Sequence, residues 1–330
     1  MNFIQKHRVW FSVSARYLLG FLIVAWLLNT NLIDLSVLGQ INARVAIIAS
    51  LMVVIQVLLA AWRVKLLLVE HGIPAHFWQC VSYNCVGIFY SLFLPGGMSG
   101  DLARAYCFWR AHPDASKSAL FGALFVDRLI GTVAMLLLGL FAGTLLMTAL
   151  GLQKFVIASW VGFILFSGTY YLLVRFNRTG NKAGIGVIGR LVRFIEKIDL
   201  QGYRVGLVAG TAILGLIGHL SAVIIIYLCA DLVQSGLGFF QIIAVAPVGM
   251  LANALPLTPG GIGIGEKGFE LLFKMIGGQN GGNSFLLTRI FIFSPAILGA
   301  ITVLYQFVRY HKKVASVFEK NSIAPHQTEQ

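Results

Sequence analysis

The chain contains repeated apolar stretches of about 20 residues, the length at which a helix spans the hydrocarbon core of a bilayer. Only 11% of its 330 residues are charged and 58% are hydrophobic, whereas a soluble domain carries about 25% charged residues. This composition excludes a soluble enzyme, a disulfide scaffold, a DNA-binding domain and a disordered protein. The sequence predicts an all-α polytopic membrane protein, with six full transmembrane helices at 9–28, 43–61, 129–149, 155–174, 206–230 and 286–308.

Two further apolar stretches, 77–94 and 239–255, differ from these spans because they contain several polar side chains. Each runs into a proline–glycine break, LPGGMSGD at 94–101 and TPGGIGIGE at 258–266. Broken backbone at membrane depth is tolerated only where protein buries it or where it lines a cavity. We therefore expect two re-entrant hairpins built from broken helices rather than two more full spans.

The distribution of basic residues indicates how the chain is threaded. The 175–204 segment carries seven Lys and Arg residues against Glu196 and Asp199, and segments of this kind stay in the cytoplasm. If 77–94 crossed the membrane fully, this segment would lie outside. A re-entrant 77–94 places every basic segment and both termini in the cytoplasm. The net charge of +13 then predicts anionic lipid headgroups as partners and no nucleic acid.

The predicted organisation is a single transmembrane domain over 1–330. Its first half covers 9–174 with a re-entrant segment at 77–128, and its second half covers 206–308 with a re-entrant segment at 239–276. The 175–205 segment between them predicts a cytoplasmic linker, whose apolar face at 186–200 suits a helix lying on the membrane surface. A plain solvated linker helix is the alternative. Residues 309–330 form a cytoplasmic tail.

The two breaks suggest that the halves form an inverted repeat. Asp101 follows Pro95 by six residues, and Glu266 follows Pro259 by seven. Inverted repeats whose broken helices meet near the midplane are a recurrent transporter design. The alternative is a chance coincidence of two glycine–proline breaks.

Asp101 and Arg104 follow the first break and, on a helix, lie three residues apart on one face. The preceding Gly96 and Gly97 let the backbone approach a ligand closely and expose N–H groups, which suits an anionic headgroup. One hypothesis is a headgroup site formed by these residues. The other is an ion pair that only closes the hairpin.

Asp127 and Arg128 lie within a long apolar context, where a charge is costly and indicates a function. They either face a polar cavity or lie at the membrane surface, and we favour the cavity. Neighbouring residues on a helix diverge by about 100°, so each should have its own partner, and Arg104 is one candidate for Asp127.

Glu266 is the acid that follows the second break, and its neighbours are uncharged. It is a candidate for proton coupling or for contact with a cationic headgroup, with Gly260 and Gly261 offering backbone contacts. A helix-start acid that only satisfies the macrodipole is the alternative. Asn84 and Asn253 lie in the two re-entrant helices, where they satisfy freed backbone groups or touch substrate.

Three other basic residues predict no chemistry. Arg289 lies near the outer start of the last span, where we expect its side chain to snorkel. Arg63 and Lys65 match plain topology signals. The cysteines show no ligand spacing, and no nucleotide-binding or metalloprotease motif is present, so we expect no metal and no cofactor.

Four motifs in order resemble a known family. WRVKLLL, LPGGMSGDLARAY, FVDRLIG and LPLTPGGIGIGE are similar to motifs of the lysylphosphatidylglycerol synthetase transmembrane-region family, flippase-like proteins related to the membrane half of the multiple peptide resistance factor. The resemblance covers about residues 10–310. Its functional positions fall on Asp101, where Glu is common, and on Arg104, Asp127, Arg128, Gly260, Gly261 and Glu266.

The resemblance implies movement of an amphipathic lipid, a modified phospholipid or a polyprenol-linked species, between the leaflets of a bacterial cytoplasmic (inner) membrane. The chain shows no soluble aminoacyl-transferase domain, so we expect no enzymatic activity of its own and a separate lipid-modifying enzyme as partner. Without an ATP site, movement should be downhill or proton-linked. The alternatives are an intramembrane transferase that uses Asp101 or Glu266 as base on a lipid-phosphate donor, and a small-solute transporter.

Overall fold

The structure is a computed structural model that describes residues 34–93, 99–146, 203–254 and 258–322, with isolated positions between 18 and 29 and between 157 and 172. Side chains are described up to residue 308. Every regular element in these residues is helical. The elements are η1 (Leu35–Gln40), α2 (Ala43–Glu70), α3 (Phe77–Phe93), α4 (Ser99–Ala111), α5 (Lys117–Leu146), α8 (Val205–Leu232), α9 (Phe239–Asn253), η2 (Pro259–Gly261), α10 (Ile264–Met275), α11 (Gly281–Phe293) and α12 (Pro295–Ser322).

Four helical segments of the described chain are long and apolar enough to cross a membrane: Ala43–Glu70, Lys117–Thr144, Val205–Leu232 and Gly281–Val308. They confirm the predicted helices over 43–61, 129–149, 206–230 and 286–308. The last segment is not one straight helix, because α11 ends at Phe293 and α12 begins at Pro295. The predicted spans 9–28 and 155–174 lie outside the described residues except for isolated helical positions, as does most of the linker 175–205.

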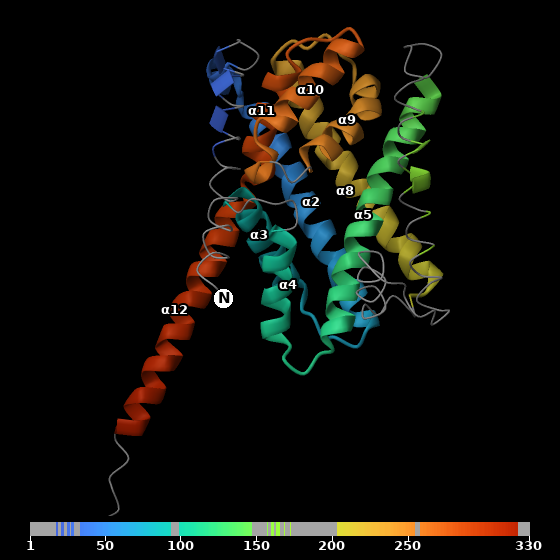
Figure 1. Cartoon of the computed structure of the whole chain (residues 1–330). Coiled ribbons are helices and arrows are strands. Elements are labelled where there is room, and N and C mark those ends of the chain that lie inside the picture. The colour runs from blue at the N-terminus through green and yellow to red at the C-terminus, as the bar shows by residue number, and fades with distance from the viewer. Residues whose placement is uncertain are drawn as a thin grey trace, which may run out of the picture.

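Two helical hairpins stand beside these long helices. In the first, α3 and α4 flank the break at 94–98; in the second, α9 and α10 flank η2. Figure 1 shows the hairpins entering from opposite ends of the molecule and pointing toward its middle. Their tips meet there, since a Cβ placed on Gly260 would lie 3.7 Å from the carbonyl oxygen of Ser91 at the end of α3.

The first hairpin is shorter than the predicted re-entrant segment 77–128. It ends at Ala111, and α5 begins at Lys117 and continues without interruption to Leu146. The turn at 112–116 contains Pro113, and the hydroxyl of Ser116 accepts a hydrogen bond from the N–H of Ala119, which starts the new helix. Residues 117–128 therefore belong to a long helix, a correction to the predicted boundary.

Small residues allow the hairpin helices to approach closely. Gly87 of α3 faces Gly100 of α4, and a Cβ on Gly100 would overlap the carbonyl oxygen of Gly87. On the other side of α3, a Cβ on Gly299 of α12 would overlap the carbonyl oxygen of Cys85. Close backbone approach at glycine is a common way to pack helices in membranes, where the hydrophobic effect does not drive helix association.

The apolar core of the described residues consists of three clusters, and two of them join residues of both halves of the chain. One cluster joins α2, α3, α4 and α5, with Leu67, Phe108 and Leu120 fully buried. A second joins α8, α9, α10, α11 and the end of α5 around Phe269 and Phe273, and a third joins α2 to α8 and α11. Each hairpin also packs across the halves, α3 against α12 and α9 against α5.

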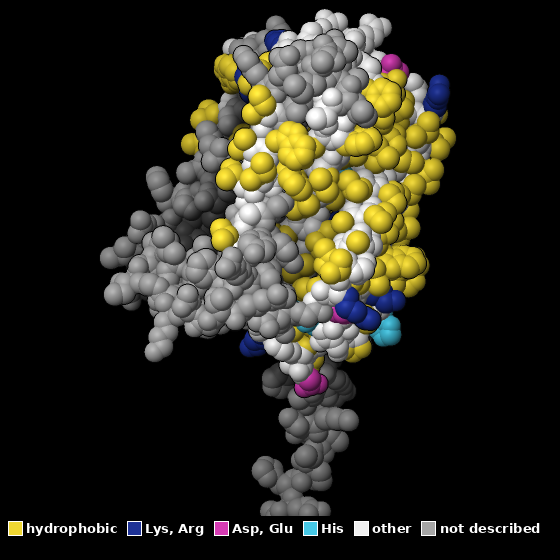
Figure 2. Space-filling view, turned by 90° about the vertical axis from the view of Figure 1, so that its right-hand side faces the viewer, with side chains coloured by type: hydrophobic (Ala, Val, Ile, Leu, Met, Phe, Trp, Pro, Cys, Tyr) yellow, Lys and Arg dark blue, Asp and Glu magenta, His cyan; other side chains and the backbone are white. Residues whose placement is uncertain are grey.

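The outer surface matches a lipid environment. Large apolar side chains on α2, α5, α8 and α12 are more than half exposed, among them Ile47, Phe141, Ile213 and Ile297. Figure 2 shows hydrophobic side chains covering the middle of one face, with charged side chains gathered mainly toward its ends. The chain is a multi-pass membrane protein.

Replacement of Gly100 by alanine should weaken the first hairpin. The added methyl group forces α3 and α4 apart, and overpacking of this kind costs about 1–3 kcal/mol. We expect a lower midpoint of thermal unfolding in detergent. Gly210→Ala in α8 is the matched control, because nothing lies within 4 Å of its Cβ position and alanine favours helix by up to about 1 kcal/mol. Equal midpoints for the two variants would contradict the close packing.

Candidate functional site

Asp127 is the centre of a buried ion network in the first half of the chain. The Nε of Arg63 on α2 donates to Asp127 Oδ1 at 2.5 Å, and the terminal nitrogens of Arg104 on α4 donate to Oδ2 at 3.2 and 3.3 Å. Asp127 is 2% exposed and lies ten residues into α5, about 15 Å from its start. It therefore faces the interior of the bundle and not the membrane surface.

Asp101 extends this network toward the outside. Its Oδ2 accepts from Nε of Arg128 at 2.8 Å and from a terminal nitrogen of Arg128 at 2.5 Å, and Arg104 lies 3.4 Å from its Oδ1. The side chain of Arg128 is 62% exposed. Asp127 and Arg128 thus have different partners, as their divergence on a helix predicts, and Arg104 is a partner of Asp127.

Asn84 completes the set, which we call the Asp127 network: Arg63, Asn84, Asp101, Arg104, Asp127 and Arg128. The Oδ1 of Asn84 accepts from Arg104 at 3.1 Å. Among the described residues, however, the Nδ2 of Asn84 and the Nε of Arg104 are buried without a hydrogen-bond partner.

The composition of the Asp127 network favours an anion. Its three arginines outnumber its two aspartates, which leaves one positive charge in excess. A buried donor without a partner costs about 1–3 kcal/mol, and an anionic oxygen would remove that cost at both Asn84 and Arg104.

Arg63 belongs to this network, although its sequence position matches only a topology signal. Its terminal nitrogens lie against two glycines, and Cβ atoms on Gly131 of α5 and Gly215 of α8 would come within 3.2 and 3.1 Å of them. The feature that could have indicated this role is the position of Arg63 inside α2, seven residues before its end at Glu70. A charge at that depth in a membrane-spanning helix needs a partner.

Arg289 organises the second half of the chain. Its Nε and one terminal nitrogen donate to the two carboxylate oxygens of Glu266. Its terminal nitrogens also donate to the carbonyl oxygens of Gly260 at 2.8 Å and Gly261 at 2.7 Å, and to Oδ1 of Asn253 at 2.9 Å. We call these five residues the Arg289 clamp, because one guanidinium group holds both sides of the break.

The prediction that Arg289 snorkels is wrong. Arg289 is 6% exposed, because it lies eight residues into α11 and at the level of the break, where acceptors surround it. Two aromatic rings also cover the guanidinium group: the ring centroids of Phe285 and Phe293 lie 4.8 and 5.6 Å from its carbon atom. A lone arginine in an apolar stretch needs a buried acid as partner. Glu266, the acid in the uncharged stretch before it, could have indicated this pair.

Glu266 is both the clamp's acid and a helix-start acid. Its Oε2 accepts a hydrogen bond from the N–H of Gly263 at 2.7 Å, directly before α10. The carbonyls of Gly260 and Gly261 are bound by Arg289, so they are not available to a headgroup in this arrangement. Gly96 and Gly97 lie outside the described residues.

The two ion sets share a pattern but not their members. In each half, the acid after the break pairs with an arginine of the following helix: Asp101 with Arg128, and Glu266 with Arg289. No ion pair among the described residues joins the two sets. The hairpin tips are in contact, whereas each acid is paired within its own half.

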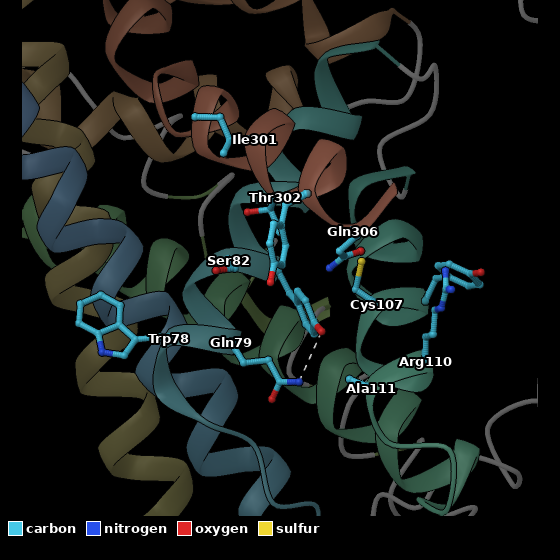
Figure 3. A pocket seen from close by; sticks show the side chains of 12 residues that line it. Trp78, Gln79, Ser82, Cys107, Arg110, Ala111, Ile301, Thr302 and Gln306 are labelled. Carbon is cyan, nitrogen blue, oxygen red and sulfur yellow. Dashed lines mark hydrogen bonds between the residues drawn. The ribbon is translucent and has the colours of Figure 1, made fainter. Parts of the chain in front are cut away.

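A cavity of about 900 Å³ lies between α3, α4 and α12. Figure 3 shows Thr302 and Gln306 of α12 facing Gln79 and Ser82 of α3, with Cys107 and Arg110 of α4 beside them. These residues are not among the predicted site residues, because no single stretch of sequence brings α3 and α12 together.

The model of the lysylphosphatidylglycerol synthase TM region matches residues 13–311. The chain belongs to this family. No curated protein matches the chain by sequence. The match covers both hairpins, the Asp127 network, the Arg289 clamp and the cavity, so all of them are parts of a lysylphosphatidylglycerol synthase TM region.

Removal of Arg289 should destabilise this TM region strongly. Arg289→Ala leaves Glu266 buried without its partner, and breaking a buried ion pair in this way costs about 3–5 kcal/mol. Arg289→Lys should rescue little, because an ammonium group lacks the planar fork that reaches the carboxylate and two carbonyls together. Thermal unfolding in detergent measures both effects.

Arg204→Ala is the control for this series. Arg204 pairs with Glu70 at 3.0 Å, but its side chain is 81% exposed, and exposed pairs contribute about 0–1 kcal/mol. A similar loss of stability in Arg204→Ala and Arg289→Ala would contradict the clamp.

Proposed function

We propose that this chain moves an amphipathic lipid, a modified phospholipid or a polyprenol-linked species, between the leaflets of a bacterial cytoplasmic membrane. The observation that carries the proposal is the contact between the tips of the two hairpins, which enter from opposite ends of the molecule (Figure 1). As re-entrant elements of an inverted repeat, they would divide the bilayer into two half-length paths, one from each leaflet.

The Asp127 network would replace the hydration of the headgroup. A charge at the bilayer centre costs about 2.5–3.5 kcal/mol on insertion scales, and this barrier normally prevents lipids from crossing. One excess positive charge, and two buried donors without a partner among the described residues, are suited to an anionic headgroup. Asp101 and Asp127 keep the arginines in place, and Asn84 orients Arg104. The acyl chains would remain in the lipid outside.

Two alternatives are less well supported. A transferase needs an acid that is free to take a proton, but both oxygens of Glu266 already accept hydrogen bonds, and Asp101 accepts two from Arg128. A small-solute transporter needs a path enclosed by protein, whereas the cavity borders α12, whose outer side chains are exposed.

We also propose an orientation of the chain in the membrane. The turn at 112–116 lies at the same end of the molecule as the pair of Glu70 with Arg204. Arg204 ends the basic 175–204 segment of the sequence. This end would face the cytoplasm together with both termini and the linker 175–205. The lipid would come from a separate lipid-modifying enzyme on that side.

Transport should be directly measurable in reconstituted vesicles. With a fluorescent lipid and a quencher confined to the outer leaflet, we expect the full chain to accelerate loss of protected fluorescence for at least one lipid in an anionic and zwitterionic panel. Arg104→Gln should slow the loss of protected fluorescence by at least about tenfold, the factor that corresponds to 1.4 kcal/mol. In this variant Arg63 remains the ion-pair partner of Asp127, but the headgroup loses a hydrogen-bond donor. Arg204→Gln, at the exposed pair, should transport normally. No acceleration for any lipid would overturn the proposal.

Side-specific labelling tests the opposed hairpins. Asp114→Cys, in the turn after α4, should react only from the cytoplasmic side, and Gln279→Cys, in the turn after α10, only from the outside. The native cysteines, Cys80, Cys85, Cys107 and Cys229, are all buried and should give little background. Labelling of both variants from one side would contradict the inverted arrangement.

A further inference from the structure

The cavity between α3, α4 and α12 exists because two helices touch at one level and separate below it. α12 meets α3 at Gly299, whose Cα lies against the backbone of Cys85. Two residues further on, Ile301 begins the wall of the cavity, which continues to Gln306. Figure 1 shows α12 leaning away from the bundle beyond this contact. The glycine contact closes the cavity toward the hairpin tip, while its other end lies near the turn at 112–116.

The lining of the cavity is mainly apolar by area, and its polar side chains carry little charge. Amide and hydroxyl side chains line two walls, namely Gln79, Ser82, Thr302 and Gln306. Arg110 is the cation of the lining, and no carboxylate is among the described lining residues. Amides and hydroxyls donate and accept hydrogen bonds, as hydroxyl groups of a ligand require, and a guanidinium matches a phosphate.

The cavity opens at a surface that is suited to lipid. Trp78 and Tyr305 line it and are 70% and 63% exposed. Aromatic rings with a polar end favour the interface between headgroups and acyl chains. The neighbouring outer face of α12 is apolar, with Ile297, Leu298 and Leu304 exposed. A lipid whose headgroup fills the cavity can therefore keep its acyl chains along α12.

The cavity is also one helical turn from the Asp127 network. Cys107 lines the cavity and follows Arg104 on α4 by three residues, a rise of about 4.5 Å. On α3, the lining residue Tyr83 directly precedes Asn84. A headgroup in the cavity would thus lie close to the donors that are unpartnered within the network.

We propose that this cavity is the lateral entry site for the lipid, and that it selects a phosphodiester headgroup that carries free hydroxyl groups. Arg110 binds the phosphate, and the amide and hydroxyl side chains of α3 and α12 bind the hydroxyls. This inference rests on the proposed lipid transport and adds the substrate class and the point of entry. Phosphatidylglycerol and a sugar-phosphate polyprenol share this chemistry.

Native mass spectrometry of the full chain, titrated with defined lipids, tests the inference. The probes are phosphatidylglycerol, a hexosyl-phosphate polyprenol, phosphatidic acid, which lacks headgroup hydroxyls, and phosphatidylethanolamine. Phosphatidylglycerol or the polyprenol should bind at least about tenfold more tightly than the last two, and competition between them identifies the source. Equal binding of phosphatidic acid would overturn the hydroxyl selection.

Two variants locate the site. Thr302→Trp places a large ring inside the cavity, where it obstructs the headgroup; it should weaken binding of the preferred lipid by at least about tenfold and slow its transport. Arg110→Gln should remove the preference for anionic over zwitterionic lipids. The matched control is Ile213→Trp, which places the same ring on the exposed outer face of α8, outside the lining of the cavity, and should change neither measurement.

The outcomes separate this inference from the proposed function. If the unmodified chain transports lipid and Thr302→Trp binds and transports it equally well, the entry site is overturned while lipid transport stands. If the unmodified chain transports no lipid but binds phosphatidylglycerol in a Thr302→Trp-sensitive manner, the proposed function fails and the cavity keeps its ligand.

Discussion

The structure depends on how the backbone is satisfied at the second break. Inside a membrane each unpaired carbonyl costs several kcal/mol, and the PGG sequence at 259–261 interrupts the helical hydrogen bonds. A guanidinium group has five donors in a fixed plane, and Arg289 uses its donors on Glu266, Asn253 and the carbonyls of Gly260 and Gly261. This clamp allows the tip of the second hairpin to lie against Ser91 in the middle of the molecule.

The two halves share the acid–arginine pattern, but the two sets differ in charge balance and in how many of their hydrogen-bonding groups have partners. Around Arg289 the charges balance, and Glu266 accepts from both the arginine and the N–H of Gly263. The Asp127 network keeps an excess positive charge and two buried donors without partners in the described chain. Saturated polar groups confer rigidity, whereas unsatisfied ones offer a ligand something to bind. The second half thus provides the scaffold, and the first half carries the chemistry that we assign to the headgroup.

The polar character of α3 has a structural explanation. Gln79 and Ser82 line the cavity, Asn84 binds Arg104, and Ser91 meets the second hairpin. α3 therefore presents polar atoms at successive levels, from the cavity through the Asp127 network to the hairpin tip. A lipid-facing helix would carry these groups at a cost, but a helix surrounded by α2, α4 and α12 does not.

The sequence alone determined the membrane location and the four described spans, because these follow from hydropathy. It also determined both breaks, from backbone chemistry, and the separate partners of Asp127 and Arg128, from helical periodicity. It also showed the family through its ordered motifs. Only the tertiary structure decided that Arg63 and Arg289 are buried in ion networks, that α5 begins at Lys117 and that α12 forms a cavity with α3. Periodicity indicates which face of a helix a residue occupies, but the partner of Arg63 is 64 residues away and that of Arg289 is 23 residues away. Such pairs depend on the rotation and height of helices against each other, which packing sets.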